Sequence, residues 1–145
     1  MTITRESSSW FGTEQADIQA YLEAIAAEGY PVQEVVDARC SACGGNVFDI
    51  EIDDDEGYVL RSCAGCGERF EMLDSADVAE EAEIGDAQCP CGSEQFEIAV
   101  GFALREDQEI RWVYVGARCV ADGQLGVYAD WKIDYSPSRH LLQQV

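Results

Sequence analysis

The spacing of apolar residues predicts one amphipathic helix near the start of the chain. Its apolar residues recur three or four positions apart, at Ile18, Tyr21, Leu22 and Ile25. We expect this helix to span residues 13–28, because Thr13 is a suitable N-terminal cap and Gly29, with Pro31 close behind it, ends the pattern. The apolar face would cover a sheet, and the polar face would remain in water.

From residue 35 the apolar positions change to a period of two, which is typical of β-strands. The stretch "VFDIEI" at 47–52 alternates, the acidic stretch at 53–57 predicts a turn, and "YVL" at 58–60 leads back. These features predict a hairpin. Residues 75–85 combine many acids with little periodicity, so we interpret them as an acidic linker.

Longer alternating runs follow in the second half of the chain. Residues 96–104 alternate without a break, "REDQE" predicts a turn, and Ile110, Trp112 and Tyr114 continue the same period. The next run is expected to point Val127, Ala129, Trp131, Ile133 and Tyr135 to one side and Tyr128, Asp130, Lys132 and Asp134 to the other. Ser136 and Pro137 then resemble the cap and first residue of a short closing helix.

A repeated segment is the clearest sign of internal organisation. "DARCSACGGNVFDI" at 37–50 aligns with "DAQCPCGSEQFEI" at 86–98 if the second copy lacks one residue between its cysteines. "RSCAGCG" at 61–67 likewise aligns with "ARCVADG" at 117–123. The sequence therefore predicts a duplicated unit in which a hairpin joins two short cysteine-containing loops, or knuckles.

The first copy has the spacing of a four-sulfur metal site. Cys40 and Cys43 are separated by two residues, as are Cys63 and Cys66, and a hairpin-like segment of 19 residues lies between the pairs. Two intervening residues let both sulfurs face one ion, and the glycine after each pair permits a tight turn. These four cysteines are the expected ligands of site 1, with zinc the favoured metal. Four buried reduced cysteines are the alternative interpretation.

With these pairs, residues 35–73 resemble the zinc-ribbon group, small hairpin modules whose two knuckles hold one zinc ion. The resemblance extends less closely to residues 86–135 through the duplication, and implies that Cys40, Cys43, Cys63 and Cys66 ligate zinc. The pairs are also similar to those of rubredoxin, in which iron replaces zinc and carries electrons. We favour zinc because the segment between the pairs here alternates as a hairpin with an acidic tip.

The second copy departs from the four-cysteine pattern in two ways. Cys89 and Cys91 have only Pro90 between them, and Asp122 stands where the first copy has a cysteine. A carboxylate oxygen is a legitimate zinc ligand, so we predict a second site formed by Cys89, Cys91, Cys119 and Asp122. The alternative is a unit that has lost its ion and is stabilised by its aromatic core. His140 could replace Asp122, although a surface position suits it better.

These features predict a mainly β protein with an N-terminal helix, of the α+β class. The expected organisation is an N-terminal segment at 1–34, a zinc ribbon at 35–74, the acidic linker at 75–85, a zinc-ribbon-like unit at 86–136 and a C-terminal tail or short helix at 137–145. Two tandem antiparallel units packed together, with the helix alongside, are the expected architecture.

Charge decides which partners are plausible. The 145 residues include 29 acids and nine bases, for a net charge of −20, and the chain from Gly123 onward is neutral overall. Nucleic-acid binding depends on cationic contacts with phosphates, so we expect no direct binding of nucleic acid unless another subunit supplies the cations. A basic protein is the favoured partner, as for an immunity protein or antitoxin that neutralises a basic toxin. The alternative is that the acidity serves solubility alone.

The sequence favours a binding protein over an enzyme. A catalytic zinc needs an open coordination position and a nearby general acid or base, yet His140 is the only histidine, and neither a zinc-deaminase motif nor a glycine-rich phosphate loop occurs. No signal-peptide pattern or run of ~18 apolar residues is present, so a cytoplasmic location with no membrane contact is expected. In that reducing compartment seven cysteines indicate metal before disulfides.

Overall fold

The computed structural model describes residues 3–6 and 9–145, and it confirms the predicted α+β class. The described residues form mainly antiparallel β-structure, with α1 (Asp17–Ala26) as their α-helix. The strands are β1 (Thr4–Glu6), β2 (Ser9–Phe11), β3 (Glu34–Asp37), β4 (Phe48–Asp53), β5 (Tyr58–Cys63), β6 (Arg69–Glu71), β7 (Gly85–Asp86), β8 (Phe96–Leu104), β9 (Ile110–Cys119) and β10 (Gln124–Lys132). Two 3₁₀ segments, η1 (Ser75–Val78) and η2 (Arg139–Gln143), complete the described secondary structure.

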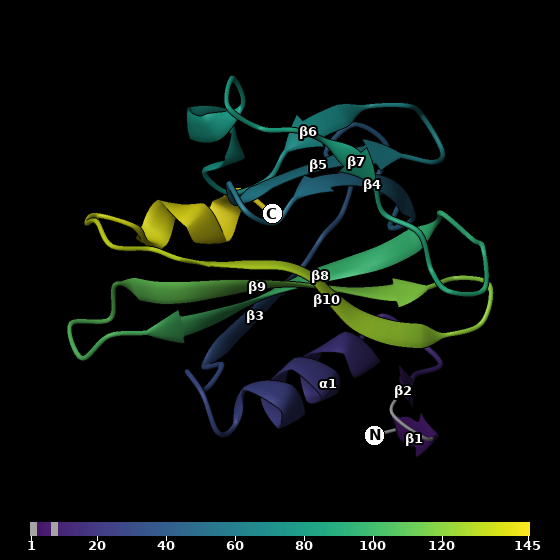
Figure 1. Cartoon of the computed structure of the whole chain (residues 1–145), viewed down its shortest axis with the longest axis horizontal. Coiled ribbons are helices and arrows are strands. Elements are labelled where there is room, and N and C mark those ends of the chain that lie inside the picture. Colours follow the sequence, from purple (N-terminus) through teal and green to yellow (C-terminus); the bar gives the residue numbers. More distant parts are fainter. Residues whose placement is uncertain (1–2, 7–8) are drawn as a thin grey trace.

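The strands join in the order β1-β2-β10-β9-β8-β4-β5-β6, with β3 also pairing with β8 and β7 with β4. The strands β4 and β8 meet through one residue pair, Phe48 opposite Phe96. Because this link is so short, the two halves of the sheet lie one above the other, with α1 as a third layer (Figure 1).

The main core lies between the two halves of the sheet and draws on both halves of the chain. Phe48, Ile50 and Val59 from the first half pack in one buried cluster with Phe96 and Val113 from the second. The strands alternate as predicted here, since Phe96, Ile98, Val100 and Phe102 of β8 are all fully buried in this cluster. Burial of these side chains stabilises the contact between the halves, at roughly 1.5–3 kcal/mol for each large apolar side chain.

A second cluster holds α1 against the opposite face of β8, β9 and β10. Ile18 and Leu22 of the helix are fully buried there. The sheet presents small residues to them, and a Cβ atom at Gly116 would lie 2.9 Å from Ile18 Cγ2 and 3.0 Å from a Leu22 methyl group. Glycine at this position therefore permits the close approach of the helix.

The predicted start of the helix is wrong by one turn. The helix begins at Asp17, and residues 13–16 form turns in front of it. The buried Asp17 carboxylate accepts hydrogen bonds from the backbone N–H groups of Thr13 and Glu14 and from the Thr13 hydroxyl. A carboxylate that bonds back to these N–H groups stabilises a turn rather than a further helical turn.

Two β-bulges overturn the predicted alternation of β9 and β10. In β9, Trp112 pairs with Ala103 but Ile110 pairs with Leu104, so Arg111 is an extra residue. Ile110 consequently lies in the main core, whereas Tyr114 and Trp112 lie in the cluster around α1. A bulge moves every later side chain to the other face of a strand, and hydrophobic periodicity alone does not reveal it.

The bulge in β10 makes Tyr128 the extra residue, between the pairs Val127–Gly116 and Ala129–Val115. The expected outward position of Tyr128 is wrong, because its ring packs edge-on against Phe96 at 4.9 Å between centroids. Val127 lies on the helix side instead.

The final residues pack against the first half of the chain. A 3₁₀ segment, η2, replaces the predicted short helix, and Leu141 and Val145 are buried in the main core. The backbone N–H of Leu73 donates to the carbonyl oxygen of Gln144 at 2.7 Å. Figure 1 shows this segment between the two halves of the sheet.

Candidate metal centres

The four cysteines of site 1 lie together at the base of the β4–β5 hairpin. Cys40 and Cys43 come from the loop before β4, Cys63 ends β5, and Cys66 lies in the loop before β6. The Sγ atoms of Cys40 and Cys66 are 3.5 Å apart, as are those of Cys43 and Cys63, and all four lie within 4.8 Å of one another.

These distances fit a tetrahedral metal site rather than disulfides. Zinc–sulfur bonds of about 2.3 Å place the sulfurs of a tetrahedron about 3.8 Å apart, whereas a disulfide bond is about 2.05 Å long. All seven cysteines of the chain are free thiols in the structure. The donor set of site 1 can therefore hold a divalent ion such as zinc.

Short backbone hydrogen bonds fold each knuckle of site 1 around its sulfurs. The N–H of Gly44 donates to the carbonyl of Cys40 and that of Gly67 to the carbonyl of Cys63, at 2.8 and 2.9 Å. Both glycines have a positive φ, 77° and 82°, which only glycine adopts readily. The predicted role of the glycines as turn formers is thus confirmed.

Site 2 brings together the three remaining cysteines and Asp122. The Sγ atoms of Cys91 and Cys119 are 3.6 Å apart, and Cys89 Sγ lies 3.5 Å from Asp122 Oδ1. The ligand atoms of all four residues lie within 4.8 Å of one another. The cluster has room for a metal with three sulfur ligands and one oxygen ligand, the donor set expected from the sequence.

The shortened knuckle at Pro90 closes as a smaller turn of the same kind. The N–H of Gly92 donates to the carbonyl of Cys89 at 2.8 Å, and Gly92 has a φ of 99°. Asp122 is held by its own turn, because its Oδ1 atom accepts the backbone N–H of Gln124 at 2.9 Å. The aspartate therefore has a fixed direction toward the three sulfurs.

Equivalent positions of the two aligned segments make equivalent contacts. Phe48 pairs with Cys63 as Phe96 pairs with Cys119. The N–H of Ala38 donates to the carbonyl of Ile98, and the N–H of its counterpart Ala87 donates to the carbonyl of Ile50, both at 2.9 Å. The residues leading into each first knuckle therefore pair with a hairpin strand of the other copy.

The sulfurs of each site influence one another's protonation. The backbone N–H of Cys66 stabilises the Cys63 thiolate and, with further hydrogen bonds from Gly65 and Cys43, lowers the pKa of Cys63 to about 6. Burial raises the pKa of Cys89 to about 12, with its sulfur neighbours adding to the effect. A divalent cation would relieve this crowding, because metal binding replaces protons on grouped thiols.

Asp122 is suited to ligation in its ionised form. Burial alone would raise the pKa of the Asp122 carboxyl group. Hydrogen bonds from the N–H of Gln124 and from the thiols of Cys119, Cys89 and Cys91 lower it by a larger amount, so the net pKa falls below its usual value. An ionised carboxylate is the form that binds metal.

His140 is exposed on η2 and belongs to neither cluster among the described residues. Three nearby residues were missed by the sequence reasoning. Glu68 Oε1 lies 3.8 Å from Cys40 Sγ, Gln124 Oε1 lies 3.7 Å from Cys89 Sγ, and Arg61 is buried beside site 1. Glu68 and Gln124 each lie two residues after the last ligand of a site, a spacing that could have drawn attention to them.

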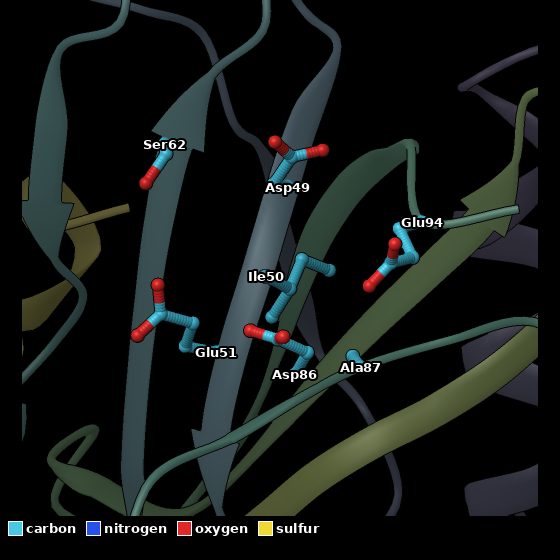
Figure 2. Close-up of a pocket in the computed structure, with 7 residues that line it drawn as sticks. All are labelled: Asp49, Ile50, Glu51, Ser62, Asp86, Ala87 and Glu94. Carbon is cyan, nitrogen blue, oxygen red and sulfur yellow. The ribbon is translucent and has the colours of Figure 1, made fainter.

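A small acidic pocket lies where the two halves of the chain meet. It has a volume of about 190 Å³ and is lined by Asp49, Glu51, Asp86 and Glu94 together with Ile50, Ser62 and Ala87. Figure 2 shows that the carboxyl groups come from β4, β7 and the loop before β8. Four carboxylates of the chain thus lie around this one pocket.

Comparison of the chain with protein-family models, curated proteins and solved structures finds no match. In the described part of the chain, no helix has the length and apolar character needed to cross a membrane.

Proposed function

We propose that this protein binds two zinc ions at structural centres, has no catalytic role of its own, and presents an acidic surface to a basic protein partner. The two four-ligand clusters carry this proposal. In both, residues distant in sequence converge with ligand atoms within 4.8 Å. Each cluster would be a small ribbon-like unit, and the duplicated contacts support two related units in tandem.

A structural role suits the ligand sets. Site 1 offers four sulfurs, which complete a tetrahedral zinc and leave no position for substrate. Site 2 completes the same coordination number with Asp122, whose turn holds the carboxylate in place. Zinc at these positions would join the two ends of each hairpin, where residues 63 and 119 end their strands.

The proposed partner is basic because the chain has few cations with which to bind anything acidic. Among the described residues, four of the nine bases form ion pairs, and their partners are Glu51, Glu97, Asp134 and Glu34. Arg61 is buried. The remaining surface is strongly acidic, and the pocket of Figure 2 offers carboxylates from three segments to a basic side chain. An immunity-like or antitoxin-like role is one that fits this chemistry.

Native mass spectrometry with elemental analysis tests the metal proposal. Two zinc ions per chain are expected. If the protein is red, contains iron and bleaches on reduction, an electron-transfer role replaces the zinc proposal. If the chain binds no metal after reconstitution, the metal proposal is overturned. Retention on DNA resin in ~0.2 M salt would instead favour a nucleic-acid role.

Two matched charge variants test the partner proposal, with polylysine as the probe. The first variant combines Glu51→Gln, Asp86→Asn and Glu94→Gln, and the second combines Glu80→Gln, Glu81→Gln and Glu83→Gln. Both remove three charges, but only the first removes them from the pocket. A larger loss of polylysine affinity in the first variant is expected. Equal affinities in both variants and the unaltered chain would contradict a docking role for this acidic surface.

A further inference from the structure

Arg61 occupies an unusual position for a cation. It lies in β5 and is only 3% exposed, with its guanidinium carbon 4.7 Å from the ring centre of Phe48 and 4.6 Å from that of Phe70. A guanidinium retains its charge in proteins, and stacking between rings suits its flat shape. Arg61 therefore places a full positive charge inside the first half of the chain.

The hydrogen bonds of Arg61 leave part of its guanidinium unsatisfied. Its Nε donates to the backbone oxygen of Val145 at 2.9 Å, and its Nη2 approaches the carbonyl oxygen of Arg39 at 3.4 Å. Its Nη1 atom is buried without a hydrogen-bond partner. A buried cationic N–H group without a partner is costly, so an anion near Nη1 is expected.

Site 1 is the anion that the surroundings of Arg61 provide. Arg61 lies two residues before Cys63 on the same strand, so both side chains are on the same face. Its bond to the Arg39 carbonyl places it beside the residue that precedes Cys40.

We propose that Arg61 is the buried counter-cation of the zinc centre formed by Cys40, Cys43, Cys63 and Cys66. One zinc ion with four thiolates carries a net charge of −2, and the buried guanidinium offsets part of it. Arg61 is thus a positioning and charge-compensating residue that retains the metal and makes the thiolates less reactive. This inference rests on the proposed zinc binding.

Site 2 has no residue equivalent to Arg61, so it serves as a control within the same protein. The position equivalent to Arg61 is Ala117, two residues before Cys119 and fully buried. Arg118, the next residue along, is engaged by Glu97 at 2.8 Å and by the Gly12 carbonyl at 2.9 Å. The two sites therefore differ in electrostatic environment as well as in ligands.

The test measures alkylation of each cysteine by N-ethylmaleimide in the zinc-loaded full chain, together with zinc loss to a chelator. Arg61→Met, which removes the charge at similar volume, should accelerate zinc loss and alkylation at site 1 by about 10–100-fold and leave site 2 within about twofold. Arg61→Lys should recover most of the difference, because it restores the charge without the planar group. Unchanged site 1 rates in Arg61→Met, or equal rates in Arg61→Met and Arg61→Lys, would overturn the proposal.

Asp122→Cys provides a test that does not alter the core. It gives site 2 four sulfurs while Ala117 still occupies the position equivalent to Arg61, so the cysteines of site 2 should still be alkylated at least fivefold faster than those of site 1. Equal alkylation rates at the two sites would overturn the proposed role of Arg61 even if Arg61→Met did not fold. Zinc content, measured on the same samples, shows separately whether the proposed metal binding itself has failed.

Discussion

Phe48 lies opposite Phe96 at the single residue pair that joins β4 to β8, and each also pairs with a cysteine of its own hairpin. Both rings are fully buried. Arg61 stacks on Phe48, and Tyr128 packs against Phe96. The pair therefore connects the two candidate metal centres through one continuous core.

Phe96→Ala is expected to lower the free energy of unfolding by about 3–5 kcal/mol, because a large ring is removed from a tightly packed core. Urea denaturation of the metal-loaded protein measures this loss. Ile84→Ala is the control, since Ile84 is 45% exposed and its truncation should change stability by no more than about 0.5 kcal/mol. A loss below about 1 kcal/mol for Phe96→Ala would contradict the core described above.

Asp122→Ala should reduce the metal content from two ions per chain to one. The remaining three sulfurs of site 2 leave a coordination position open, so the ion exchanges with chelators, whereas site 1 is intact. Native mass spectrometry after brief chelator treatment measures the stoichiometry. Asp55→Ala, which removes an exposed acid from the β4–β5 turn, should retain two ions. Two tightly held ions in Asp122→Ala would show that Asp122 is not a ligand.

Complete removal of metal should unfold the region around β4, β5 and β6 before the β8–β10 region. Structural zinc contributes roughly 10–16 kcal/mol of apparent binding energy, and the first half has shorter strands than the second. Hydrogen exchange followed by mass spectrometry would detect lost protection at residues 48–71 after chelation. A fully protected, metal-free first half with four free thiols would refute the stabilising role of site 1.

Gly116→Ala should displace or strain α1 and cost about 1–3 kcal/mol, because the added methyl group would lie 2.9 Å from Ile18 Cγ2. Thermal unfolding measures the effect. Gly85→Ala is the matched control, since nothing lies within 4 Å of an added Cβ there and φ is not positive. That control should be neutral or slightly stabilising. Equal midpoints for the two variants would contradict the close helix packing.

Tyr58 should make the protein less stable at alkaline pH. Burial, followed by its hydrogen bond to Glu71 at 2.7 Å and nearby carboxylates, raises the pKa of Tyr58 from 10.0 to about 12. The folded state therefore retains this proton more strongly than the unfolded state, and its contribution is complete below pH 10 and lost as pH rises toward 12. Urea midpoints across this range should fall less steeply in Tyr58→Phe, and an identical slope would contradict the assignment.

The ligand knuckles could be located from sequence because their chemistry is local. Two residues between cysteines and a following glycine determine a turn, and the structure places Cys40, Cys43, Cys63 and Cys66 within one cluster. The second cluster could be predicted from the repeat, because the alignment of the two copies places Asp122 opposite a cysteine. Hairpin turns at 53–57 and 105–109 were likewise predicted from local clusters of polar and acidic residues.

The remaining features depend on contacts between distant parts of the chain. The bulges at Arg111 and Tyr128 satisfy packing across the sheet, and no short-range pattern marks them. Nothing in the sequence around Arg61 marks it as buried, yet rings from two other strands enclose it. The start of α1 was misplaced because Asp17 stabilises the preceding turn, which competes with the capping expected from Thr13.

The pairing between the two copies determines when the first copy can fold during synthesis. Val35 of β3 lies opposite Gly101 of β8, so the lead strand of the first copy has no partner until the ribosome has produced the second. Contacts this distant in sequence form late and leave strand edges exposed in the meantime. The four cysteines of site 1 are all present once Cys66 has been made, but the nascent first half must wait for β8 before its sheet is complete.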